Sequence, residues 1–306
     1  MNEALAVFGF LSVASLAGLA LKICAKDPVY RDTIKNLNAR IRSWWIMCGI
    51  FFIAMLSGPK WSIVLFACIS FFALRELITL MPTRVADHRS LLWVFFILMP
   101  LQYILLGLNW YGLFSIMIPV YAFLLIPARS VIAGDCERFL ERVAKIQWSL
   151  MLAVYCVSYA PALLTLNIHG YDGRNAELLF YFIFVVQISD VLQYVFGKFF
   201  GKRKIAPLVS PNKTWEGFFG GCASAILIGA ALYPITPFNF WQAALMSSAA
   251  VLAGFAGGLT MSAIKRDRGV KDFGTLIEGH GGMMDRIDSI CFAAPLFFHL
   301  TRYFFV

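Results

Sequence analysis

The chain has 306 residues, of which 60% are hydrophobic and 14% are charged, with a net charge of +9 and a mean hydropathy of +0.75. This apolar share exceeds that of soluble domains and excludes an ordinary soluble enzyme. The apolar runs are too long and unbroken for barrel strands, so the predicted fold class is an all-α polytopic integral membrane protein with about ten transmembrane helices.

Ten apolar segments approach the roughly 20 residues that a membrane-spanning helix needs. They cover about 5–25, 44–58, 61–80, 90–108, 110–127, 146–167, 177–197, 216–234, 242–262 and 287–305. The first lacks a small-residue cleavage site, which predicts a retained span and not a signal peptide. Turn residues at 57–60 and 107–110 predict tight hairpins after the second and fourth spans. We divide the chain into N-terminal transmembrane helices (1–145) and C-terminal helices that carry the motifs (146–306).

The basic residues are distributed unevenly over the predicted loops. Of the 26 Lys and Arg residues, 23 fall on one side of the membrane, and only Lys60, Arg174 and Arg302 fall on the other. The positive-inside rule predicts that the rich side is cytoplasmic and that both termini lie outside, in the plasma (inner) membrane. No single soluble segment gathers this charge, so we expect contact with anionic lipid headgroups and not with nucleic acid. The seven cysteines lack C-x-x-C spacing and indicate neither a zinc site nor disulfides.

Two of the predicted cytoplasmic loops are rich in glycine and basic residues. Residues 196–221 include Ser210, Lys213 and Thr214, directly before Trp215 opens a predicted helix. Hydroxyls, an ammonium and the amides of a helix N-terminus together suit phosphate oxygens. The alternative is an ordinary basic loop that contacts anionic lipid.

The second loop, residues 262–288, is a polar segment between two apolar ones. On a helix, Asp285 and Asp288 would share one face, and a pair of carboxylates beside phosphate ligands suits Mg²⁺ or another divalent metal. His280 precedes them in a flexible turn. The alternatives are charge compensation at a helix N-terminus and a surface histidine.

Asp190 lies inside the seventh predicted span, about two turns from its cytoplasmic end. An ionisable residue within the membrane is costly and indicates function, and this depth would let it face the same cavity as Asp285 and Asp288. The alternative is a buried aspartate that pairs with Gln187, Gln193 or a basic residue of a neighbouring span.

The two loops resemble the signature of the CDP-diacylglycerol synthase (phosphatidate cytidylyltransferase) family. The family pattern for the second loop reads S-x-apolar-K-R, four residues, K-D, a spacer, H-G-G and D-R-apolar-D. The matching positions in this chain are Ser262, Lys265, Arg266, Lys271, Asp272, His280, Gly281, Gly282, Asp285, Arg286 and Asp288. The upstream F-G-K-x-x-G-K and S-P-x-K-T-x-E-G run is matched by Lys198, Lys202, Ser210, Pro211, Lys213, Thr214, Glu216 and Gly217. The resemblance covers about the C-terminal 120 residues closely.

The resemblance implies a membrane transferase in which the phosphate of phosphatidic acid attacks the α-phosphorus of CTP, giving CDP-diacylglycerol and pyrophosphate with a divalent metal. It assigns catalysis to Asp285, Asp288, Lys265 and Arg266 and metal binding to Asp285, Asp288, Asp190 and Asp272. Substrate binding falls to Ser210, Lys213, Thr214, Lys271, His280 and Arg286. The expected partners are CTP, phosphatidic acid and membrane lipids, and the sequence leaves a homodimer open.

The chain departs from the family pattern at three places. Gly258 stands where the family commonly has an acid, and Glu278 stands where it has proline. After Asp190, where small residues leading to A-Y are usual, the chain has the bulkier run Val191-Leu192-Gln193-Tyr194. The alternative function is therefore a catalytically impaired protein of the same fold that binds or transports a lipid phosphate. The D-x-x-D-G pattern of the CDP-alcohol phosphotransferases is absent, which disfavours a third class of membrane enzyme.

Overall fold

The computed structural model describes residues 28–277 and 281–306, together with residues 12 and 15. Within these ranges six helices are long and apolar enough to cross a membrane. They are Pro59–Thr79, Val85–Gly107, Tyr111–Val131, Phe139–Thr165, Asn175–Phe200 and Phe240–Asp267. Apolar side chains such as Ile104, Phe123 and Leu252 are exposed on their outer faces, as lipid contact requires. The protein is therefore an integral membrane protein built mainly of helices.

Three of these helices change their winding midway through a π-helical segment. The first consists of a short 3₁₀ turn (Val85–Asp87), α4 (His88–Trp93), the π segment Val94–Leu98 and α5 (Met99–Gly107). The second consists of α6 (Tyr111–Ile116), the π segment Met117–Ala122 and α7 (Phe123–Val131). The third consists of α8 (Phe139–Leu150), the π segment Met151–Cys156, α9 (Val157–Ala162) and a 3₁₀ turn, Leu163–Thr165. The other three are continuous: α3 (Pro59–Thr79), α10 (Asn175–Phe200) and α12 (Phe240–Asp267).

The remaining elements are shorter in their apolar extent. They are α2 (Pro28–Leu56), of which Ile41–Leu56 is apolar, α11 (Trp215–Ala231), a 3₁₀ turn at Tyr233–Ile235, α13 (Met284–Ile287), α14 (Ile290–Phe305) and an antiparallel hairpin of β1 (Lys204–Ala206) and β2 (Ser210–Thr214). The hairpin was not expected, because the sequence around it predicts only a polar loop.

The described helices bear out part of the predicted span pattern. Six predicted spans correspond to the long apolar helices. Those at 44–58, 216–234 and 287–305 fall on the apolar part of α2 (Ile41–Leu56), on α11 and on α14, each of which is shorter than the roughly 20 residues of a span. The predicted span at 5–25 lies outside the described residues except for positions 12 and 15. Both predicted tight turns are confirmed, since Gly58 and Asn109 have positive φ angles of 103° and 56°.

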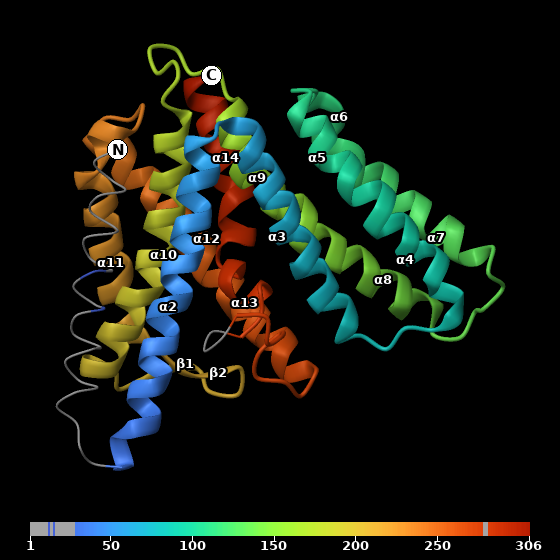
Figure 1. Cartoon of the computed structure of the whole chain (residues 1–306), viewed down its shortest axis with the longest axis horizontal. Helices are drawn as coiled ribbons and strands as arrows, with labels where there is room; N and C mark the ends of the chain where they lie inside the picture. The colour runs from blue at the N-terminus through green and yellow to red at the C-terminus, as the bar shows by residue number, and fades with distance from the viewer. Residues whose placement is uncertain (1–11, 13–14, 16–27, 278–280) are drawn as a thin grey trace.

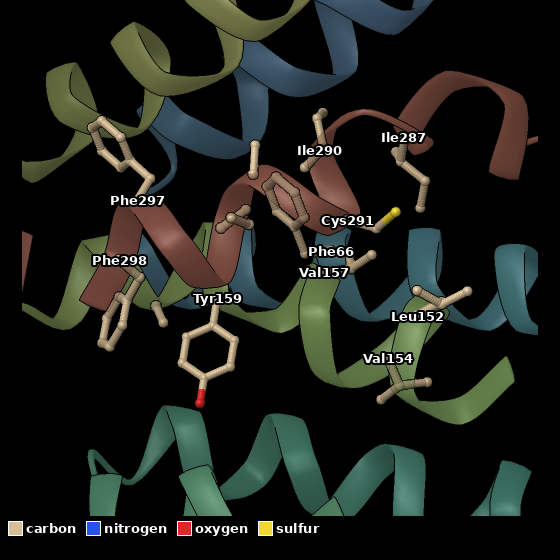
Figure 2. Packing of buried hydrophobic residues seen from close by; sticks show 14 of the residues in the cluster. Phe66, Leu152, Val154, Val157, Tyr159, Ile287, Ile290, Cys291, Phe297 and Phe298 are labelled. Atoms are coloured by element: carbon tan, nitrogen blue, oxygen red, sulfur yellow. The ribbon is translucent and has the colours of Figure 1, made fainter. Parts of the chain in front are cut away.

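The core forms where α14 crosses α9 and α10 (Figure 2). The ring of Phe298 lies 5.1 Å from that of Tyr159, and the ring of Phe297 lies 4.9 Å from that of Phe182. All four side chains are almost fully buried. Because these aromatic contacts fix α14 against its neighbours, they also fix the segment that immediately precedes it.

Helices α10 and α11 approach each other closely through glycines. A Cβ added at Gly221 would lie 2.4 Å from the backbone nitrogen of Gln193, and one at Gly217 would lie 2.8 Å from the Cα of Gly197. The glycines thus allow backbone contact along the helix pair, as small residues commonly do between membrane helices.

The β1–β2 hairpin and α13 lie at the same end of the molecule, and the C-terminus lies at the other (Figure 1). The two polar loops that the sequence singles out are therefore neighbours in space. The C-terminal end of α3 reaches the same region, through contacts between α3 and α13.

Candidate active site

The β1–β2 hairpin positions Lys213 at the site, and α11 begins directly after the hairpin. Thr214 is the N-cap of α11, and its Oγ1 accepts a hydrogen bond from the amide of Gly217 at 3.1 Å. Its side chain is almost fully buried against glycines at 197, 201 and 217. The predicted helix start at Trp215 is thereby confirmed, and Thr214 acts as a cap.

The Lys213 ammonium lies beside Gly258 of α12. A Cβ built on Gly258 would lie 2.9 Å from Lys213 Nζ and 3.5 Å from Ser289 Oγ. The ammonium also lies 4.7 Å from the ring centroid of Phe255, which is a cation–π distance. Burial lowers the pKa of Lys213, and the nearby charges of Asp190 and Asp288 oppose that shift.

Asp190 and Asp288 meet around Ser289. The Ser289 hydroxyl donates to Asp190 Oδ2 at 2.7 Å, and the Ser289 amide donates to Asp288 Oδ1 at 2.8 Å. The charges of Lys265 and Lys213 act on Asp288 from nearby. The structure thus brings together two predicted metal ligands from segments about 100 residues apart, and sequence reasoning had missed the serine between them.

Asp285 has a different environment. Its Oδ1 accepts from Lys265 Nζ at 2.8 Å, and its Oδ2 accepts from the amides of Phe273 at 2.8 Å and Gly282 at 3.0 Å. The Lys265–Asp285 ion pair is largely buried. Both carboxylate oxygens therefore already have protein donors, which fits an anchor of the loop better than an open metal ligand.

Glu76 of α3 reaches the same loop from the N-terminal half of the chain. Its Oε1 accepts from the amide of Met283 and its Oε2 from the amide of Met284, each at 2.8 Å. Sequence reasoning missed this residue. An acid near the end of an apolar span was the available signal, but the adjacent Arg75 gave it the appearance of an ordinary interfacial charge.

The other predicted residues surround this centre with varied contacts. Arg266 donates to the carbonyls of Val209 and Val270, so it ties the hairpin to the end of α12. Arg286 has a buried Nε without an acceptor among the described residues. Its carbonyl accepts from Gln187, one of the partners considered for Asp190.

Four predicted residues remain at the edge of this arrangement or outside the described part. Lys271 and Asp272 are exposed, and Asp272 Cγ lies 3.3 Å from the position of a Cβ on Gly281. Ser210 starts β2 opposite Ala206. His280 lies outside the described residues.

A divalent metal is compatible with Asp190 and Asp288. In the described parts of the chain, no group of three or more His, Cys, Asp or Glu side chains could hold a metal by itself. The second oxygen of each of these two carboxylates receives no hydrogen bond from a described residue. Two carboxylates completed by water and substrate phosphates are a common donor set for Mg²⁺.

Comparison with known proteins identifies the family of the chain. The sequence model of the cytidylyltransferase family matches residues 38–304. The chain is 41% identical to the uncharacterized protein YnbB of Escherichia coli K12 over 88% of both chains. It is 35% identical to phosphatidate cytidylyltransferase of Staphylococcus aureus COL over 60% of this chain and 74% of the relative. It is 36% identical to the enzyme of the same name from Staphylococcus epidermidis over 50% of this chain and 61% of the relative.

The family match spans the hairpin, the Asp190–Ser289–Asp288 group and the loop that Glu76 and Asp285 hold. It includes the N-terminal half from residue 38 onward as well as the motif-bearing half, so the resemblance seen in the two loops extends through most of the protein. The chain belongs to the cytidylyltransferase family and is a nucleotidyltransferase of the membrane.

Proposed function

We propose that the protein transfers a cytidylyl group from CTP to phosphatidic acid, giving CDP-diacylglycerol and pyrophosphate. The observation that carries this proposal is the convergence of Asp190, Asp288 and Lys213 from three segments at one end of a membrane protein. Two carboxylates and a nearby ammonium suit a reaction between two polyanions, whose repulsion must be offset. The names of the staphylococcal relatives support the choice of lipid substrate.

In the reaction, a phosphate oxygen of phosphatidic acid forms a bond to the α-phosphorus of CTP. The bond from that phosphorus to the bridging oxygen breaks, and pyrophosphate leaves with the electron pair. Asp190 and Asp288 would hold Mg²⁺, which supplies Lewis-acid neutralisation of the phosphate charge when bound.

The protein's own cations would orient the phosphates. Lys213 stands next to the acidic pair, and Arg286 brings a guanidinium whose Nε is without a described partner. The Lys265 ammonium donates one hydrogen bond to Asp285, and its two other N–H groups can donate to phosphate oxygens. Lys271, Ser210 and His280 remain proposed substrate contacts at the edge of the site, and Asp272 remains a proposed acidic contributor.

We place the site on the cytoplasmic side of the plasma (inner) membrane, with both termini outside and about ten spans in total. The 23-to-3 division of basic residues supports this orientation. A homodimer is compatible with this proposal. A cytoplasmic site would also have direct access to CTP.

The test uses purified protein in lipid with Mg²⁺, radiolabelled CTP and phosphatidic acid, with omission of Mg²⁺ as a control. We expect a labelled CDP-lipid and release of pyrophosphate. Asp288→Asn and Asp190→Asn should each lower turnover by about 100-fold or more, because an amide cannot replace the charge that binds metal. If wild-type protein binds CTP or lipid phosphate but forms no CDP-lipid, the alternative of a binding or transport protein is favoured, and lack of CTP binding would exclude the transferase.

A further inference from the structure

The loop between α12 and α14 is held by two carboxylates that come from opposite halves of the chain. Glu76 accepts the amides of Met283 and Met284, and Asp285 accepts those of Phe273 and Gly282. All four distances lie between 2.8 and 3.0 Å. Charge-assisted bonds to a carboxylate are stronger than neutral ones, so together they fix the backbone at residues 273 and 282–284.

Two glycines make room for Glu76. A Cβ on Gly282 would lie 2.4 Å from Glu76 Oε2, and a Cβ on Gly274 would lie 2.8 Å from Glu76 Oε1. Either contact is shorter than carbon and oxygen atoms tolerate, so the carboxylate could not enter if these positions carried side chains. The sequence thus keeps a space of the right shape for an acid that lies about 200 residues away along the chain.

Glu76 acts at the start of the segment that ends in Asp288. Met283 and Met284 are followed by the single turn of α13 and then by Asp288 and Ser289. Met284 and Ile287 are buried, so this turn moves as one unit with its neighbours. A shift at the amides of Met283 and Met284 would therefore displace Asp288 relative to Asp190, which α10 holds in place.

We propose that Glu76 is a positioning residue for Asp288, and that it couples the N-terminal helices to the site. Among the described residues, the hydrogen-bond donors to Glu76 are backbone amides of the loop, so its effect on the reaction passes through the placement of Asp288. The inference rests on the proposed function for its catalytic meaning, whereas the coupling itself can be measured without turnover.

The main variant is Glu76→Gln, which keeps the shape of the side chain. It replaces one carboxylate oxygen by an NH₂ group, which cannot accept a hydrogen bond from a backbone N–H. The matched control is Glu141→Gln, which removes a partly exposed acid that pairs with Arg138 and Lys145 away from the loop. Hydrogen exchange of peptides that cover 273–289 should be faster in Glu76→Gln and unchanged in Glu141→Gln.

Two further measurements test positioning. The affinity for Mn²⁺, read by electron paramagnetic resonance, and kcat should each fall by about 10- to 100-fold in Glu76→Gln, as is typical when a partner that orients a metal ligand is lost. The KM for CTP should change little. Glu76→Asp should restore part of the loss, because it keeps the charge, and Gly282→Ala should reproduce the loss by blocking the carboxylate.

The outcomes separate this inference from the proposed function. Unchanged exchange at 273–289 in Glu76→Gln overturns the coupling, and faster exchange with wild-type kcat and Mn²⁺ affinity overturns the positioning role. Wild-type protein that binds Mn²⁺ but forms no CDP-lipid would overturn the proposed function alone, since the Glu76 effect on Mn²⁺ affinity still decides the inference. Absence of both activity and Mn²⁺ binding in the wild type would overturn both.

Discussion

The two aspartates of the D-R-apolar-D run differ in their chemical surroundings although they are three residues apart. Asp288 keeps an oxygen that no described residue hydrogen-bonds, whereas Asp285 is enclosed by Lys265 and two backbone amides. The spacing predicts that both belong to one site. It could not distinguish their roles, because the donors to Asp285 come from the loop and from α12.

This difference predicts opposite phenotypes for two similar variants. Asp285→Asn should leave the largely buried Lys265 ammonium without its counter-charge, which costs about 3–5 kcal/mol in comparable buried pairs. Asp288→Asn should lower turnover by about 100-fold or more and leave the thermal unfolding temperature in detergent near that of the wild type. Equal unfolding temperatures for the two variants would contradict the anchoring role of Asp285.

Gly258 is the residue at which the chain departs from the family signature in the centre of the site. A side chain there would meet Lys213 Nζ and Ser289 Oγ, both of which are polar ends of side chains and not backbone. Gly258→Asp should therefore fold and place a third carboxylate next to Asp190 and Asp288. We expect Mn²⁺ affinity to rise by about 10-fold or more, since each added carboxylate strengthens a hard-cation site.

Gly258→Asn is the matched control for that prediction, because it has the same shape without the charge. It should leave Mn²⁺ affinity near the wild-type value. Equal affinities in the Asp and Asn variants would show that position 258 does not face the metal. A rise in CDP-lipid formation in Gly258→Asp would show that the natural site is limited by metal binding.

At the scale of the elements, the contact between α10 and α11 sets the distance between Asp190 and the hairpin that carries Lys213. The glycine at 221 lies against the backbone of Gln193, one turn beyond Asp190. Gly221→Ala should separate the helices and cost about 1–3 kcal/mol, the usual effect of overpacking. Gly49→Ala in α2 is the control, because a Cβ there meets nothing within 4 Å.

Denaturant titration in detergent micelles measures that cost. Gly49→Ala should be neutral or stabilising, since alanine is favoured over glycine within a helix. If Gly221→Ala is as stable as Gly49→Ala, the close approach of the two helices does not contribute to stability.

Much of the element pattern follows from the sequence, but not its detail. Hydropathy locates the helices around 61–80, 90–108 and 177–197, and turn residues locate the breaks at Gly58 and Asn109. The sequence could not predict the hairpin, because β1 and β2 are only three and five residues long and carry mixed polar residues. It could not show Glu76 in the site either, since the partners of this residue are backbone amides, which have no signature in sequence.

At the scale of the whole molecule, the β1–β2 hairpin and α13 lie at one end, and the C-terminus of α14 lies at the other (Figure 1). This separation makes the orientation in the membrane a functional question, because CTP must reach the hairpin and α13. The positive-inside rule predicts that the end with the site faces the cytoplasm.

Cysteine labelling in intact cells tests this orientation. Cys136 is exposed in the loop between α7 and α8, on the predicted cytoplasmic side. In a variant that retains only this cysteine, a membrane-impermeant maleimide should react only after the membrane is permeabilised. The control adds Lys60→Cys to a cysteine-free chain, because Lys60 is exposed at the opposite turn and should react in intact cells. Labelling of Cys136 in intact cells would reverse the orientation, and the site would then lie on the side of the membrane that has no supply of CTP.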